Sequence, residues 1–256
     1  MLKLIKYEFR RSRTSLIVML AAALLLYLAA PLGSLLKREG LMGVSLFGLM
    51  FYCFAAYVYV LIRGVSAYSS ELSTRSGYMM LMAPRSTLSI VFSKLLFTLC
   101  FAIVMLAVCA LACFGSALVF MDEVFDVRGF IPMLKYFASQ MEIDLASLGY
   151  FALYAVVSAL ISVISVVSMG YLSATLSAAI AARSKGAKFL SAALFLVLLI
   201  LVGKVSTLVS PEAAVQSFTD LRIALTSAIP TLLVNLGFTA LFTCLSALIL
   251  KKRVCL

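Results

Sequence analysis

The side chains able to carry out chemistry are few in this chain, and the missing ones are informative. There is no histidine among the 256 residues, which excludes a histidine-dependent triad, a histidine-ligated zinc and a histidine proton relay. No phosphate-binding loop of the form GxxxxGK[ST] occurs either, so the chain lacks the motif that binds a nucleotide. We therefore expect no catalytic, cofactor-binding or metal site in this chain, and no enzyme.

The cysteines are the remaining nucleophiles, and nearly all of them lie in long apolar stretches: Cys53, Cys100, Cys109, Cys113 and Cys244, with Cys255 close to the C-terminus. None lies in a segment expected outside the cell, so we expect no disulfide framework. Cys109 and Cys113 are one helical turn apart, a spacing that fits a metal pair. Without further ligands nearby, we favour the alternative that both are small apolar packing residues.

Six long and nearly uncharged stretches predict the helices on which these side chains lie. They are residues 16–36, 41–62, 95–121, 148–170, 189–209 and 224–250, and the fifth alone contains a charge, Lys204. Hydrocarbon cannot hydrogen-bond a backbone, so apolar runs of about 20 residues form spanning helices. With 64% hydrophobic residues and no polar connection long enough for a soluble domain, the sequence predicts one all-α membrane domain of six transmembrane helices over residues 1–256.

Charge predicts which way the helices face. Fifteen of the 21 basic residues lie before the first span, between the second and third, between the fourth and fifth, and after the sixth. By the positive-inside rule both termini of this multi-pass protein are cytoplasmic, and we expect the plasma membrane as its location. A net charge of +11 would also fit nucleic acid, but topology and contact with anionic lipid explain it, so we expect the lipid bilayer and no nucleic acid as a partner.

Residues 1–13 form a basic segment ahead of the first span. Lys3, Lys6, Arg10 and Arg13 recur at helical spacing beside an apolar stripe, which predicts an amphipathic helix lying on the inner membrane surface. The alternative is an unstructured basic tail that only sets the topology.

Residues 63–94 form the longest cytoplasmic segment. Pro84 disfavours helix at the residue before it, and Ser86 or Thr87 is suited to cap a new helix that runs into the third span. The segment also contains an apolar run, residues 78–82. Apolar residues rimmed by charge indicate either a docking surface or an interfacial helix.

Three motifs at these positions resemble the ABC-2 family of transporter permeases. They are the opening LKLIKYEFRR at residues 2–11; ELSTRSGYMMLMAPRS at residues 71–86, followed by SKLL at residues 93–96; and ARSKGA at residues 182–187. The resemblance covers the whole chain in topology and about 40 residues in motif.

The resemblance implies a fold and a function. The fold is a type V exporter-like transmembrane domain with an N-terminal interfacial helix. The function is that of a permease subunit of an ATP-driven ABC transporter, in the export direction. Such a subunit pairs with two copies of a separate ATPase, which would hold ATP and Mg²⁺, and with a second permease copy or a related permease.

The family resemblance also assigns residues to the contact with the ATPase. The loop between spans two and three carries the coupling helix, and the residues that take this role are Glu71, Arg75, Gly77, Tyr78 and Pro84. Lys185 and Lys188 would make a smaller cytoplasmic contact. As alternatives, Glu71 and Arg75 pair with each other at i, i+4 in solvent, and the two lysines act only in setting topology.

A second set of polar residues lies inside the spans. Ser158, Ser162 and Ser165 share one face of the fourth span, where they either line a pathway or allow close helix packing, and we favour packing. The fourth span should end near Gly170, because the uncharged stretch is longer than a bilayer core requires. Asn235 in the sixth span is expected to bond a neighbouring helix.

Two other functions fit the same topology. A non-transporting membrane scaffold or accessory protein would need no ATPase. A secondary carrier is disfavoured, because the spans contain no Asp or Glu to serve as an ionisable group at the midplane.

Overall fold

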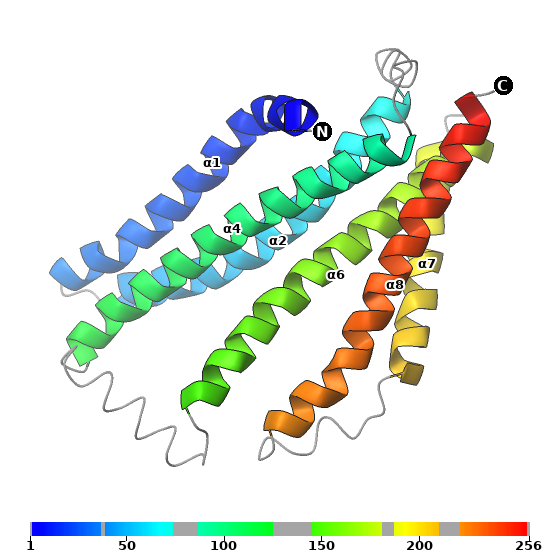
Figure 1. Cartoon of the computed structure of the whole chain (residues 1–256). Coiled ribbons are helices and arrows are strands. Elements are labelled where there is room, and N and C mark those ends of the chain that lie inside the picture. Colours follow the sequence, from blue (N-terminus) through cyan, green and yellow to red (C-terminus); the bar gives the residue numbers. More distant parts are fainter. Residues whose placement is uncertain are drawn as a thin grey trace. The chain divides into compact units, whose positions relative to one another are not determined.

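The computed structural model describes residues 2–36, 39–73, 87–124, 145–180, 187–209 and 221–254. These residues form six α-helices and no strand: α1 (Leu2–Leu35), α2 (Glu39–Ser73), α4 (Thr87–Val124), α6 (Leu145–Ile180), α7 (Ala187–Val209) and α8 (Leu221–Val254) (Figure 1). Each helix contains a segment long and apolar enough to cross a membrane. The expectation of an all-helical protein with six potential membrane spans is therefore confirmed.

The helices are longer than their apolar spans. α6 has 36 residues, or about 54 Å, against a hydrocarbon core of about 30 Å. It continues ten residues past Gly170, where we expected the span to end, and residues 171–175 are buried. Bilayer thickness sets only the shortest spanning helix, and packing against neighbouring helices stabilises the extra turns. α1 likewise contains residues 2–13 and the first apolar stretch in one continuous helix.

The chain divides into two compact units, and α2 and α4 contribute one end to each. Unit 1 consists of Met1–Ile5, Leu61–Leu99 and Tyr150–Leu256, and unit 2 consists of Lys6–Val60 and Cys100–Gly149. The two units are described separately below.

Unit 2 is built mainly from α1 after residue 5, the first part of α2 and the last part of α4, which lie side by side in Figure 1. Its core contains Ala23 of α1 with Tyr52 and Ala56 of α2. The Tyr52 hydroxyl donates a hydrogen bond of 2.9 Å to the carbonyl of Met19. Small alanines let the helices approach closely, which is how helices associate without a hydrophobic driving force between them.

Unit 1 contains α6, α7 and α8 with the last part of α2 and the first part of α4. Its hydrophobic core joins Met169 and Leu172 of α6 to Val202 of α7 and Phe242 of α8. Because these four side chains come from three helices, α6 is held by both of the helices that follow it in the chain.

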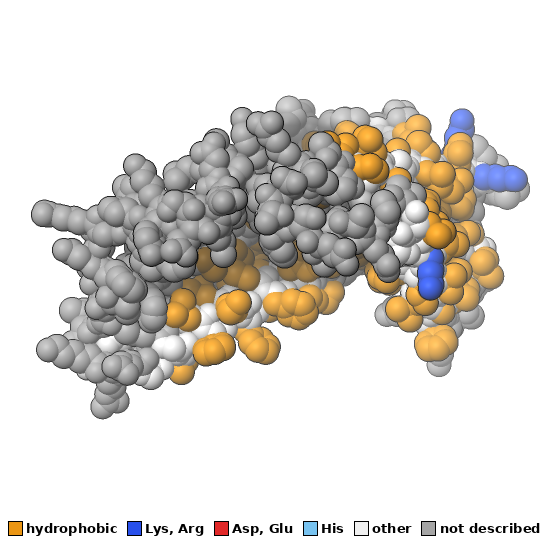
Figure 2. Space-filling view, turned by 90° about the horizontal axis from the view of Figure 1, so that it is seen from below, with side chains coloured by type: hydrophobic (Ala, Val, Ile, Leu, Met, Phe, Trp, Pro, Cys, Tyr) orange, Lys and Arg blue, Asp and Glu red, His pale blue; other side chains and the backbone are white. Residues whose placement is uncertain are grey.

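Large apolar side chains also cover the outside of the helices. Leu208 is 85% exposed, Phe189 82% and Phe51 79%. In the view of Figure 2 most of the described side-chain surface is hydrophobic. A surface of this kind is stable in contact with lipid, which agrees with a multi-pass membrane protein.

Candidate functional site

The predicted coupling segment is described only at its two edges. Glu71 lies in the last turn of α2, and α4 begins at Thr87, one of the two positions where we expected the new helix. Lys188 lies in the first turn of α7. The other coupling or contact residues lie outside the described part of the chain: Arg75, Gly77, Tyr78, Pro84 and Lys185. The structure describes the contacts of the two flanking helix ends, the end of α2 and the start of α4.

Two glycines set the contact of α2 with α4 and α6 in unit 1. A Cβ on Gly64 would lie 2.8 Å from Thr98 Cγ2 and 3.2 Å from Val167 Cγ2. A Cβ on Gly170 would overlap one Val65 methyl, and would lie 3.1 Å from the other and 3.3 Å from Val65 Cβ. Each glycine therefore allows an approach that a larger residue would prevent.

Beside these glycines, a buried cluster joins α2, α4 and α6. The rings of Tyr68 and Tyr171 stack with centroids 4.4 Å apart, and Tyr171 is completely buried. Thr98 Oγ1 donates to the Lys94 carbonyl at 3.0 Å and lies 3.4 Å from Tyr171 Oη. Since the threonine hydrogen points to Lys94, the Tyr171 hydroxyl is the donor to Thr98. We call Tyr68, Thr98 and Tyr171 the tyrosine cluster.

Basic side chains lie on two of the three helices that form this cluster, α2 and α4. Lys94 of α4 is buried, with 4% exposure, and so is its neighbour Ser93, which donates to the Ile90 carbonyl at 2.8 Å. On α2 the Nε atom of Arg63 is buried without a hydrogen-bond partner among the described residues. Burying a cationic group is costly in an apolar setting, so these positions are more constrained than ordinary span residues.

A second contact joins α6 to α8. Ser165 Oγ lies 2.8 Å from Thr239 Oγ1 and donates to the Asn235 carbonyl at 3.1 Å. Thr239 donates to the same carbonyl at 2.7 Å. The backbone carbonyl of Asn235 therefore accepts one hydrogen bond from α6, whereas we expected its side-chain amide to bond a neighbouring helix.

The three predicted serines of α6 have different surroundings. Ser165 is buried and reaches α8, whereas Ser158 donates to the carbonyl of Ala155 in its own helix at 3.0 Å. Ser162 is half-buried. Further along α6, four buried hydroxyls donate to the carbonyl three residues earlier: those of Ser168, Ser173, Thr175 and Ser177. These hydroxyls are satisfied without water, which suits tight helix packing.

The cysteines in unit 2 form an arrangement that their spacing alone did not predict. Cys113 Sγ lies 3.7 Å from Cys53 Sγ of α2, while Cys109 packs against the core around Tyr52. The thiols in the described part of the chain are free. No group of three or more Cys, Asp or Glu side chains placed to hold a metal occurs among those residues.

Tyr68 and Thr98 of the tyrosine cluster lie on α2 and α4, the two helices that flank the predicted coupling residues. Sequence reasoning missed Tyr68, Thr98 and Tyr171, since they come from three separate stretches of the chain and no spacing links them. The tyrosine cluster contains no catalytic group and holds the end of α2 and the start of α4 against α6. Searches against protein-family models, curated proteins and solved structures find no match to this chain, so its function has to be inferred from its own residues.

Proposed function

We propose that the chain is the permease subunit of an ATP-driven ABC transporter of the ABC-2 type, acting in export. The proposal places it in the plasma membrane with both termini in the cytoplasm. It is supported by the three motifs at residues 2–11, 71–96 and 182–187 and by the six helices able to span a membrane. The observation that carries it is the tyrosine cluster, which joins the helices flanking the loop to α6.

In this proposal the segment that links α2 to α4 docks on an ATPase subunit and moves when the ATPases close on ATP. The end of α2 and the start of α4 cannot move independently of α6, because Gly64, Gly170 and the tyrosine cluster leave no space between them. A packed interface shifts as a unit rather than deforming continuously. Ser165 then passes the displacement from α6 to α8.

The partners follow from the same scheme. Two ATPase chains bind ATP and Mg²⁺, and a second permease copy or a related permease completes the pathway, since six helices provide half of it. Any ATP hydrolysis takes place on the ATPase chains and none on this one.

The first experiment is affinity purification from native membranes in a mild detergent, followed by mass spectrometry of the co-purifying chains. We expect a stoichiometric partner that carries a phosphate-binding loop. An intact complex without such a partner would contradict the proposal and leave a scaffold or a secondary carrier as the function.

The coupling assignment is tested separately. Glu71→Arg and Gly77→Pro should leave the chain in the membrane but uncouple ATP hydrolysis from transport in reconstituted vesicles. Lys252→Glu, a charge reversal at an exposed position near the end of α8, serves as the control and should transport normally. If both loop variants transported at the wild-type rate, these residues would not be coupling residues.

A further inference from the structure

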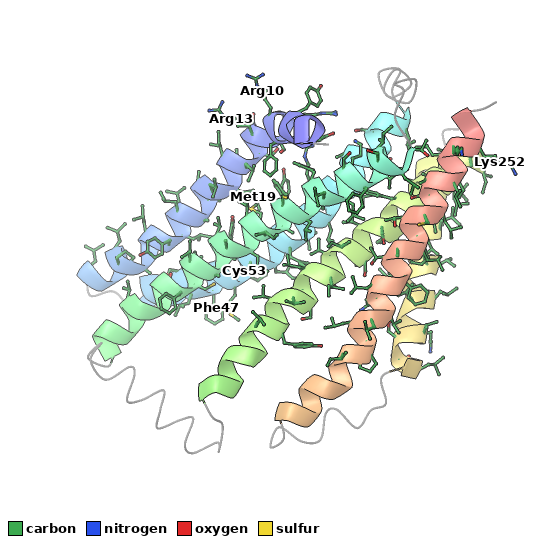
Figure 3. All side chains as sticks on the ribbon, in the orientation of Figure 1. Arg10, Arg13, Met19, Phe47, Cys53 and Lys252 are labelled. Atoms are coloured by element: carbon green, nitrogen blue, oxygen red, sulfur yellow. The ribbon has the colours of Figure 1, made fainter. Side chains whose placement is uncertain are left out.

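The first turns of α1 have one buried face and one exposed face. Glu8 is 6% exposed and Ser12 is fully buried, and the Ser12 hydroxyl donates to the Glu8 carbonyl at 3.0 Å. Tyr7, Arg10 and Arg13 are exposed, and in Figure 3 the side chains of Arg10 and Arg13 project outward from α1. Burial of Glu8 and Ser12 therefore fixes the direction in which the two arginines point.

The exposed side of α1 becomes apolar immediately after these arginines. Ile17, Val18, Leu24 and Leu28 are all exposed and recur at helical spacing. Ile17 lies about 6 Å along the helix axis from Arg13 and about 10 Å from Arg10. The surface thus changes from cationic to hydrocarbon within one to two turns, which is the profile of a phospholipid from its headgroup to its acyl chains.

We propose that Arg10 and Arg13 bind the phosphate of an anionic phospholipid whose acyl chains lie along residues 17–28 of α1. A guanidinium presents a planar set of donors that matches phosphate geometry, and i, i+3 spacing brings both groups to one side of the helix. The apolar stripe selects a lipid over a free phosphate. Because this site uses no residue of the coupling loop, it stands independently of the transporter proposal.

A lipid with net negative charge is favoured over a zwitterionic one. In phosphatidylcholine the positive headgroup amine offsets the phosphate charge, whereas phosphatidylglycerol keeps it. Each basic residue near an anionic headgroup increases binding about fivefold. Two arginines should therefore give a clear preference for phosphatidylglycerol at this position.

The experiment uses the absence of tryptophan from this chain. Tyr7→Trp places a single fluorophore at an exposed position beside Arg10. The protein is reconstituted in vesicles in which either phosphatidylglycerol or phosphatidylcholine carries brominated acyl chains that quench tryptophan. We expect brominated phosphatidylglycerol to bind about fivefold or more preferentially at this position, and the preference to fall as salt rises.

Two comparisons make the result decisive. Phe47→Trp, at a 74% exposed position of α2, should show no preference between the lipids. Adding Arg10→Gln and Arg13→Gln to Tyr7→Trp should abolish the preference, whereas Lys251→Gln with Lys252→Gln, an equal charge loss at exposed residues of α8, should keep it.

The proposal is overturned if the two lipids quench the Tyr7→Trp variant equally, or if the preference survives the arginine substitutions. Displacement of the lipid by inorganic phosphate beyond the loss caused by sodium chloride at the same ionic strength would also contradict it, since the site would then recognise phosphate alone. Were the double variant to misfold, the single substitutions Arg10→Gln and Arg13→Gln would each have to lower the preference for the proposal to stand.

Discussion

Substituting alanine for Gly170 probes the contact between α2 and α6 directly. The new Cβ would overlap one methyl of Val65 and lie 3.1 Å from the other. Rotation about χ1 of Val65 could move these methyls, but Val65 Cβ itself would remain 3.3 Å away, closer than normal van der Waals contact. The two helices therefore have to separate for Gly170→Ala to be accommodated.

The magnitude follows from this geometry. Overpacking a close contact costs about 1–3 kcal/mol, and alanine recovers up to about 1 kcal/mol because it favours helix more than glycine does. Because the new Cβ would overlap a Val65 methyl, the cost should lie in the upper part of that range, about 2–3 kcal/mol. After the helix-propensity gain of about 1 kcal/mol, we expect Gly170→Ala to lower the free energy of unfolding by about 1–2 kcal/mol, or the thermal midpoint by about 2–8 °C. Val65→Ala in the same chain removes both methyls and should restore about 1 kcal/mol.

The chain has no tryptophan whose fluorescence could report unfolding, so the protein is fused to a fluorescent protein. Samples are heated to a series of temperatures, and size-exclusion chromatography measures how much folded protein remains. Gly203→Ala is the matched control, because a Cβ on Gly203 would meet nothing within 4 Å and should not lower the midpoint. Wild-type stability of Gly170→Ala, or no rescue by Val65→Ala, would refute the close α2–α6 contact and the transmission scheme that relies on it.

Three further predictions concern other contacts. Ser165→Ala removes the hydrogen bond to the Asn235 carbonyl of α8 and should cost about 0.6–1.7 kcal/mol, whereas Ser158→Ala should be near neutral; the thermal midpoints of the two variants test the difference. Tyr171→Ala leaves a cavity at a fully buried site and should cost about 3–5 kcal/mol, seen as loss of monodisperse protein on chromatography. Copper phenanthroline should oxidise Cys53 and Cys113 to a disulfide, because their sulfurs are 3.7 Å apart. Thiol counting by mass spectrometry should then detect two fewer free thiols, whereas the number of free thiols in a Cys53→Ser variant should not change on oxidation.

The helices of this protein could be predicted because hydrocarbon permits few alternatives. An uncharged run of about 20 residues has to satisfy its backbone internally, and each of the six runs lies in a helix. Helix ends were less predictable. Gly170 was expected near the end of a span, yet α6 continues to Ile180, since the residues beyond it pack inside unit 1 and no bilayer dimension limits them.

The contacts between helices could not be read from spacing. Helical periodicity placed Ser165 on a face with two other serines. It could not predict that this face contacts α8, because that depends on how the helices pack. The same holds for Cys113, whose nearby thiol belongs to Cys53, 60 positions away. Spacing along the chain relates Cys113 only to Cys109, one helical turn away. Tyr171 lies just past the fourth apolar stretch and carries no sequence signal of its own, and its importance depends on Tyr68 stacking against it.

The hydroxyls that donate within α6 have a mechanical consequence. From Ser168 to Ser177 each of them shares a carbonyl that a backbone amide of the helix also uses, and such sharing weakens the backbone ladder and favours bending. The backbone hydrogen bonds of this stretch of α6 should therefore be weaker than those of residues 153–161, and its amides should exchange with deuterium sooner, although the packing of its side chains keeps the stretch fixed against α2 and α4.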